Sequence, residues 1–214
     1  MIDLHTHSLL SDGELLPSEL VRRAEAIGYK AIAITDHSDA SNIDFVIERI
    51  VAVCEELKSG ISVIPGVELT HIPPKQIPDM VRKARAMGAR IVLVHGETIM
   101  EPVAQGTNRA AINAGVDILT HPGLITEEDV KLAIERGVCL ELTARKGHNI
   151  SNGHVARLSK KFGACMVLNT DTHSPSDLIT AEMAIKIAMG AGLEKDDFKG
   201  INKNAERILQ KIGL

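Results

Sequence analysis

The chain has 214 residues, of which 44% are hydrophobic and only 2% aromatic, and its net charge is −4 with histidine counted as neutral. This length fits a single domain spanning residues 1–214, whose core must be built from aliphatic side chains, as in a sheet covered by helices. Because the balance is acidic and no basic run stands out, the electrostatic footprint of a dedicated nucleic-acid binder is missing.

Strand-like and helix-like segments alternate along the whole chain. Short apolar runs predict strands at 2–5, 31–34, 61–68, 90–95, 116–120, 138–142 and 165–169. Helical periodicity predicts helices at 16–28, 43–57, 76–87, 107–114, 126–136, 152–162 and 178–190, and a last helical stretch at 201–212. Strict alternation with apolar strands implies a parallel sheet. A closed or nearly closed α/β barrel of seven strands accommodates these units, and an open doubly wound sheet is the alternative.

Several features bear on the compartment. No apolar stretch approaches the roughly 20 residues that span a bilayer, so we expect no membrane contact. The first residues lack the basic start and apolar run of a signal peptide, which favours a cytoplasmic protein. Three cysteines are present, and Cys139 and Cys165 lie in apolar runs, where a buried free thiol is the commoner role.

Histidines and carboxylates gather at the predicted carboxyl ends of the strands. Active sites of parallel β/α barrels are built at that face, and in a His-x-His segment on a strand both rings point to the same side. The side chains that should converge there are His5, His7, Asp12, His37, Glu68, His95, His121, Asp171 and His173.

The set points to metal binding more strongly than any one member does. A single histidine beside a strand is more often hydrogen-bonded than a ligand, and Asp12 in Ser-Asp-Gly is typical of a turn. Six of the nine histidines, however, fall at the same end of successive strands, and bound cations offset the cost of burying them together. Imidazole with carboxylate suits zinc, manganese or iron. Nine donors suit two to three divalent ions in an open, hydrolytic site.

With these motifs in place, the chain resembles the PHP family (polymerase and histidinol phosphatase) over essentially its whole length. The resemblance rests on seven motifs, which are His5-x-His7, Ser11-Asp12-Gly13, Ala33 to His37, Pro65 to Glu68, His95, His121-Pro122 and Asp171-x-His173. It implies a distorted TIM-like (β/α)7 barrel with the metal site at its C-terminal face.

The resemblance also implies a division of the ligands among three metals. The first metal would be held by His5, His7, Asp171 and a bridging Glu68. The second would take Glu68, His95 and His121, and the third Asp12, His37 and His173. Some relatives carry histidine at the position of Asp12, so aspartate there could alter the preferred metal.

The chemistry that the resemblance implies is phosphoester hydrolysis, with catalytic roles for Glu68, Asp171 and His173. A metal-activated hydroxide would attack phosphorus, and the metals would neutralise charge on the phosphoryl oxygens. The expected substrate is a small phosphomonoester, such as a histidinol-phosphate-like compound, a sugar phosphate or a nucleotide phosphate.

Other polar residues are candidates for binding the substrate or supporting the ligands. In the loop after the sixth strand, Arg145 suits bidentate phosphate binding, and Lys146 is a second cation; either is alternatively a solvated loop charge. His148 and His154 are candidate substrate contacts, while Asp36 would orient His37 or cap its loop. His71 is a weaker candidate.

Three further interpretations stay open. A metal-dependent amidohydrolase also opens with His-x-His, but it usually has eight strands and a carboxylated lysine at the bridging position, where this chain has Glu68. A phosphodiesterase or exonuclease, or a regulatory PHP-like subunit, would use the same fold; nucleic acid is not the expected partner because a basic, aromatic-rich groove is missing. The sequence does not indicate the oligomeric state.

Overall fold

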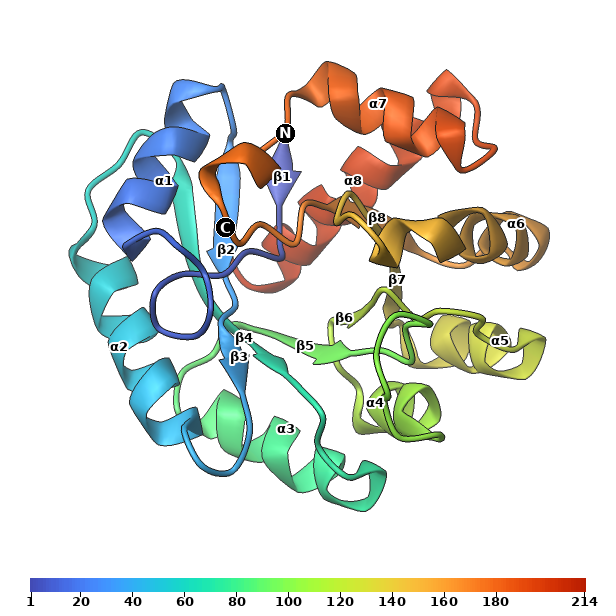
Figure 1. Ribbon diagram of the computed structural model, residues 1–214, viewed down its shortest axis with the longest axis horizontal. Coiled ribbons are helices and arrows are strands. Elements are labelled where there is room, and N and C mark those ends of the chain that lie inside the picture. Colours follow the sequence, from blue (N-terminus) through green and yellow to red (C-terminus); the bar gives the residue numbers. More distant parts are fainter.

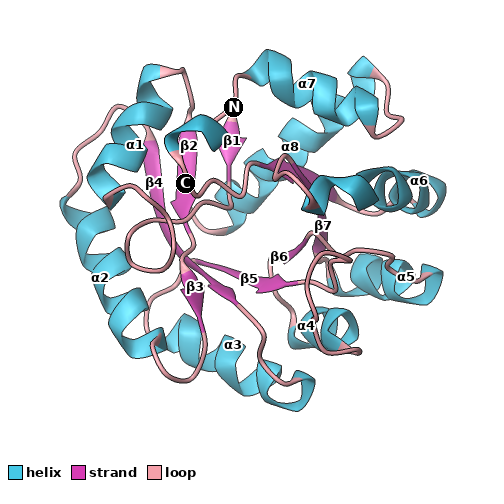
Figure 2. Cartoon of the chain, viewed as in Figure 1, coloured by secondary structure: helices cyan, strands magenta, loops and turns pink.

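Seven parallel strands form a nearly closed barrel with helices around it, in a computed structural model that describes residues 1–214 (Figures 1 and 2). The strand order is β1-β2-β4-β5-β6-β7-β8, and the short β3 pairs with β4 outside this path. The strands are β1 (Ile2–Asp3), β2 (Ala31–Ile34), β3 (His37–Ser38), β4 (Ser62–Leu69), β5 (Ile91–His95), β6 (Ile118–Thr120), β7 (Cys139–Thr143) and β8 (Met166–Asn169).

Helices α1 to α7 each come after a strand and cover the outside of the barrel, and α8 comes after α7 (Figure 2). The α-helices are α1 (Pro17–Ala26), α2 (Ile43–Glu56), α3 (Ile77–Ala86), α4 (Thr107–Ala114), α5 (Glu127–Arg136), α6 (Asn152–Phe162), α7 (Ala181–Gly190) and α8 (Lys195–Lys211). Short 3-10 turns are η1 (Pro74–Gln76), η2 (His148–Ser151) and η3 (Pro175–Asp177). None of these helices has the length and apolar character that crossing a bilayer requires.

The barrel closes between β8 and the segment that follows β1. The Asn169 side-chain oxygen accepts the Leu4 backbone N–H at 2.9 Å. Further along, the Asp171 N–H donates to the His5 carbonyl at 3.0 Å, and the His7 N–H donates to the Thr172 carbonyl at 2.8 Å. These bonds hold the segment after β1 in register with β8 and the residues that follow it. They lie at the end of the barrel where the histidines are.

The core has an outer layer between sheet and helices and an inner layer inside the barrel. The inner layer includes Leu4, Ile64, Ile91, Leu93 and Ile118, and α8 packs against its lower end through side chains such as Ile208. Since the strands are buried on both faces, their sequences read as nearly continuous apolar runs. The apolar side chains fill the barrel toward the amino ends of the strands, and the polar residues lie at the mouth, at the carboxyl ends.

Three expectations about elements need correction. The last helix begins at Lys195, six residues before the predicted start, because Glu194 and Asp197 form a capping box there. The strand predicted at 116–120 is confined to Ile118–Thr120. The additional strand β3 pairs His37 with Glu68, which brings one predicted ligand beside another.

The expectation of free thiols at Cys139 and Cys165 is wrong, because the two sulfurs form a disulfide. The residues lie 26 positions apart in sequence, but they stand at the start of the neighbouring strands β7 and β8, one position before the paired Leu140 and Met166. Strand pairing, which sequence spacing does not reveal, therefore brings them together. Cys54 is the free cysteine.

Candidate metal centre

All nine predicted ligands lie together at the mouth formed by the carboxyl ends of the strands. His5 and His7 follow β1, Glu68 lies in β4, and His95 ends β5. The other five lie in β3 or in the loops after β1, β6 and β8; they are Asp12, His37, His121, Asp171 and His173. Parallel pairing explains the convergence, because it aligns the carboxyl ends of neighbouring strands.

The first group consists of His5, His7, Glu68 and Asp171, all essentially buried. The His5 Nε2 atom lies 3.0 Å from His7 Nε2, 3.2 Å from Glu68 Oε2 and 3.6 Å from Asp171 Oδ1. His7 Nε2 lies 3.7 Å from Glu68 Oε2 and 3.2 Å from Asp171 Oδ1. Donors at the corners of a tetrahedral zinc site, each 2.0–2.1 Å from the ion, are about 3.3 Å apart, so these separations fit one ion.

The second group uses the other oxygen of Glu68. Its Oε1 atom lies 3.6 Å from His95 Nδ1 and 3.5 Å from His121 Nε2. The Asp171 Oδ2 atom adds a donor 3.7 Å from His121 Nε2. Both carboxylates thus present one oxygen to the first group and one to the second, as a bridging ligand would.

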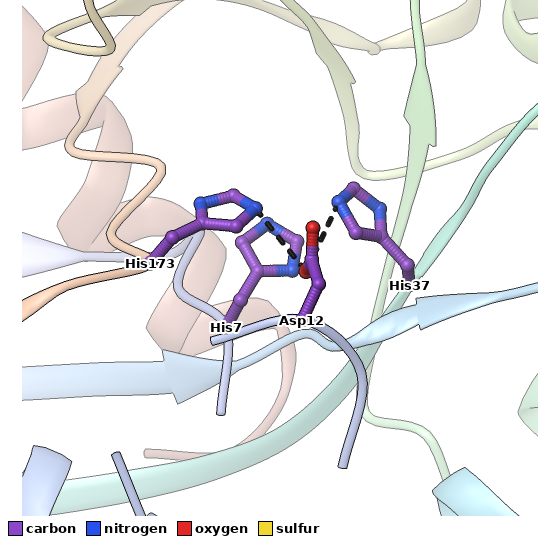
Figure 3. A group of neighbouring side chains, drawn as sticks. All are labelled: His7, Asp12, His37 and His173. Carbon is purple, nitrogen blue, oxygen red and sulfur yellow. Dashed lines mark ion pairs between the residues drawn. The ribbon is translucent and has the colours of Figure 1, made fainter. Parts of the chain in front are cut away.

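The third group consists of Asp12, His37 and His173, with His7 beside them (Figure 3). Asp12 Oδ1 lies 3.3 Å from His173 Nε2 and 3.7 Å from His37 Nε2. The His7 ring centre is 4.1 Å from that of His37 and 4.2 Å from that of His173. His7 therefore stands between the first and third groups.

Several buried polar atoms at the centre have no hydrogen-bond partner. These include both ring nitrogens of His121, Glu68 Oε2 and Asp171 Oδ1. Although Glu68 Oε2 has histidine nitrogens nearby, none of them makes a hydrogen bond to it. Leaving such atoms unpaired in the interior costs several kcal/mol in total, about 1–3 kcal/mol for each. The donor set therefore fits divalent cations, for which these atoms would be ligands.

Other residues fix the orientation of the rings. Glu141 Oε1 lies 2.9 Å from His5 Nδ1, and its Oε2 accepts the backbone N–H of His121 at 3.0 Å. His37 Nδ1 lies 2.7 Å from the Thr70 hydroxyl and 2.9 Å from Glu68 Oε2. Such partners hold a metal-binding histidine in one tautomer and one orientation, leaving its other nitrogen for the ion.

Glu101 makes a corresponding contact on the other side of the mouth. Its Oε2 atom lies 3.2 Å from His95 Nε2 and 3.0 Å from His71 Nε2, while Oε1 lies 3.3 Å from His148 Nε2. One carboxylate thus connects histidines from the loop after β4, the end of β5 and η2, and His95 keeps its Nδ1 atom toward Glu68. His71, which the sequence analysis gave as a weaker candidate, joins this network at an exposed position.

The sequence interpretation missed both supporting carboxylates. Glu141 could have been noticed, because it is a charged residue within the apolar segment Cys139 to Thr143. Burying a charge there is unfavourable unless a partner compensates for its lost hydration. Glu101 could not have been noticed, because a glutamate in a polar loop is ordinary and only the fold brings it to His95.

Two of the predicted ligands have backbone conformations that residues other than glycine rarely adopt. His121 has φ 25° and Asp171 has φ 54°. Such geometry costs about 1–3 kcal/mol per residue and persists where the surroundings enforce it. The His121 N–H is held by Glu141, and the Asp171 N–H by the His5 carbonyl. The strain is therefore concentrated where ligand direction matters.

The charges of the cluster shift the pKa values of its members apart. Burial opposes protonation of His5, but Glu68, Glu141 and Asp171 outweigh it and hold its pKa well above the usual value. Burial also opposes protonation of His95, but the nearby carboxylates of Glu101 and Glu68 overcome this and raise its pKa to about 10. Burial and neighbouring His37 lower the pKa of His7 to about 3.

The carboxylates stay ionised despite their burial. Burial would raise the pKa of Glu68, but the adjacent His5 and His37 rings hold it well below the usual range. The adjacent His95 ring lowers the pKa of Glu101 to about 2. The centre therefore combines anionic carboxylates with imidazoles that favour their protons, and a cation that bound there would displace those protons.

The predicted substrate residues occupy different surroundings. Arg145 lies at the mouth, with NH1 3.3 Å from Asp177 Oδ2, which also accepts the His173 N–H. Lys146 is exposed. His148 is buried, with its ring 4.4 Å from that of His121. His154 is directed elsewhere, because its Nε2 donates to the Ile125 carbonyl at 2.8 Å.

Asp36 fastens a loop rather than orienting His37. Its carboxylate accepts the Ser8 N–H at 2.8 Å, the Ser8 hydroxyl at 2.7 Å and the Ser11 hydroxyl at 2.6 Å. Since Ser8 and Ser11 belong to the loop that carries Asp12, Asp36 determines where Asp12 lies.

The fold and the clustered donors define a class of protein: this chain belongs to the PHP domain family, and the family's profile matches residues 3–107. Among curated relatives, the uncharacterized protein MJ1295 of Methanocaldococcus jannaschii is 52% identical over 201 residues, covering 92% of each chain. Ribonuclease P protein component 3 of Methanosarcina mazei is 28% identical over 219 residues, covering 94% of this chain and 85% of the relative.

Two solved structures share the fold. A chain in the cryo-EM structure of archaeal ribonuclease P with mature tRNA aligns with TM-score 0.74 and 21% identity, covering 98% of this chain and 90% of that one. The histidinol phosphate phosphatase of Lactococcus lactis, crystallised with zinc, L-histidinol and phosphate, aligns with TM-score 0.62 and 18% identity, covering 95% and 93%.

Proposed function

We propose that this protein is a metal-dependent phosphoesterase that hydrolyses a small phosphomonoester. The observation that carries the proposal is the first group, in which the Nε2 atoms of His5 and His7 lie 3.0 Å apart and each lies 3.2–3.7 Å from an oxygen of Glu68 and an oxygen of Asp171. It lies at the open end of a barrel that is otherwise filled with apolar side chains. The phosphatase of Lactococcus lactis, which was crystallised with zinc and phosphate, supports the proposal through its common fold.

The roles of the residues follow from their positions. His5, His7, Glu68 and Asp171 would hold one ion, Glu68 with His95 and His121 a second, and Asp12, His37 and His173 a third. When bound, zinc, manganese or iron would activate water and neutralise charge on the phosphoryl oxygens. In the overall reaction, a water oxygen bonds to phosphorus, the ester P–O bond breaks, and the alcohol leaves with a proton.

Glu68, Asp171 and His173 are the residues to which we assign catalytic roles. The Glu68 and Asp171 carboxylates each face two groups, so they would fix the spacing of the ions on which an in-line displacement depends. Arg145 would bind the phosphate through its guanidinium group, which offers paired donors, and Lys146 would add positive charge. His148 would contact the substrate beside His121.

Measurements of metal content and of hydrolysis, on wild type and on one double variant, test the proposal. Wild type should contain two to three zinc, manganese or iron ions per chain and hydrolyse an aryl phosphate in a chelator-sensitive way. His5→Ala combined with His7→Ala should lose metal and hydrolysis while keeping its circular dichroism spectrum. Full activity in the folded double variant would refute the assignment.

A second candidate function is a subunit role in an RNA-processing complex, which the likeness to ribonuclease P protein component 3 favours. The net charge of −4 argues against tight RNA binding, because phosphate contacts require cationic side chains. Tight, salt-dependent binding of tRNA by protein that lacks metal and hydrolytic activity would favour this second function.

A further inference from the structure

Large apolar side chains are exposed on three neighbouring loops beside the second group of ligands. Ile99 and Met100, each 51% exposed, lie in the loop after β5. Leu124, 63% exposed, follows β6, and Ile150, 62% exposed, lies in η2 after β7. Because β5, β6 and β7 are adjacent in the barrel (Figure 1), the loops border the same part of the mouth. We call these four residues the apolar rim.

Contacts among the loops connect the apolar rim to the metal centre. The Met100 side chain lies against the loop after β7, since a side chain at Gly147 would begin 3.2 Å from Met100 Cε. Directly before Ile99, the Thr98 hydroxyl lies 2.7 Å from His148 Nδ1. The His148 ring lies 4.4 Å from the ring of His121. The His148 side chain therefore lies between one loop of the apolar rim and His121, a predicted ligand.

The loop after β6 is fixed to the same surface. Gly123, which precedes Leu124, lies so close to the Glu97 backbone carbonyl that no side chain would fit there. The His154 side chain holds the Ile125 carbonyl from the other side. Leu124 is therefore exposed on an anchored backbone, and its position does not result from a loose loop.

Exposed apolar side chains that are grouped beside a site require a different explanation from isolated ones. Single exposed residues are normal, whereas grouped ones mark surfaces that bind a ligand or a partner. Phe45 on α2 and Ile134 on α5 are also exposed, but they lie on the outer helices. Continuity with His148 and His121 identifies the occupant of the rim as part of the molecule that reaches the metal centre.

We propose that the apolar rim binds the leaving group of the substrate and selects phosphate esters whose leaving group is uncharged and largely apolar, such as an aromatic ring. The inference rests on the proposed function for the placement of the phosphate. With the phosphoryl group at the polar donors, the ester oxygen and its substituent extend outward past His148, where Met100 and Ile150 are exposed. The unbranched, polarizable Met100 side chain adapts to a ring better than a branched one does.

Binding of two phosphonates, which have no ester bond to hydrolyse, tests the inference separately from catalysis. Phenylphosphonate and methylphosphonate are titrated calorimetrically into zinc-loaded protein. Burying about half of a phenyl ring on the rim should make phenylphosphonate bind about tenfold more tightly. Met100→Ser combined with Ile150→Ser should reduce the preference to about twofold or less. Ile134→Ser, at a residue 41% exposed on α5, is the matched control and should keep it.

Each other result has a defined meaning. Equal affinities in wild type, an unchanged preference in the folded rim variant, or no binding of either phosphonate would overturn the inference. A rim variant that changes the sedimentation of the protein but not the preference would also overturn it, and would indicate an interface between copies of the chain. A phenyl preference in protein that hydrolyses no phosphate ester would refute the proposed function, and the rim would then bind an apolar group of a ligand and not a leaving group.

Discussion

Glu141→Gln should weaken metal binding without unfolding the protein. In the wild type, Oε1 of Glu141 accepts from Asn169 Nδ2 at 2.8 Å and faces His5 Nδ1 at 2.9 Å, and Oε2 accepts the His121 N–H at 3.0 Å. A glutamine has a single acceptor oxygen. Whichever way the amide turns, its NH₂ group meets a donor, either the His121 N–H or the side chains of His5 and Asn169.

The magnitude follows from the two ligands that the carboxylate supports. Loss of a carboxylate behind a metal-binding histidine typically lowers metal affinity about 10- to 100-fold, or about 1.4–2.7 kcal/mol. We expect the upper part of this range, because the Glu141 side chain positions the His5 ring and the strained His121 backbone at once. The removed negative charge would also lower the basicity of His5.

Competition with a chromophoric zinc chelator measures the affinity, and thermal unfolding monitors the fold. Asp117→Asn is the matched control, since Asp117 is a buried carboxylate that accepts the Val92 N–H at 2.9 Å, before β6 at the opposite end of the barrel. It should lower the melting temperature and leave zinc affinity unchanged. Zinc affinity of folded Glu141→Gln within threefold of wild type would refute the reasoning.

Three further predictions concern the mouth. Arg145→Ala should raise KM for a phosphate ester about tenfold or more, with kcat less affected, because the guanidinium binds phosphate in the ground state; steady-state kinetics with an unchanged KM would place the phosphate elsewhere. Zinc uptake should release protons at neutral pH, because the raised pKa values of His5 and His95 keep both rings protonated. The affinity for zinc should therefore rise with pH. Calorimetry in buffers of different ionisation enthalpy counts the released protons, and a count of zero would contradict this prediction. Glu101→Gln should weaken one ion about 10-fold by freeing the His95 ring, and three equally tight ions in that variant would show that Glu101 does not position His95.

The meeting of the predicted ligands at one face was predictable, because it follows from the periodicity of the sequence. Alternating apolar strands and amphipathic helices indicated parallel β/α units, and parallel units place strand ends at one face. The donors in His5-x-His7, Glu68, His95 and Asp171-x-His173 could therefore be expected to meet without knowledge of any side-chain contact. The structure confirms the seven-stranded, nearly closed barrel.

Contacts between segments remote in sequence were decided only by the tertiary structure. Glu101 reaches His95 through a loop with no regular pattern, and Glu141 reaches His5 across 136 positions of sequence. The Cys139–Cys165 disulfide depends on the pairing of β7 with β8, which periodicity does not encode. The sequence by itself determined which residue types stand at the strand ends, because that requires only local conformation. The partners that orient them, and the apolar rim beside them, depend on how distant loops pack, and this is settled only when the barrel closes.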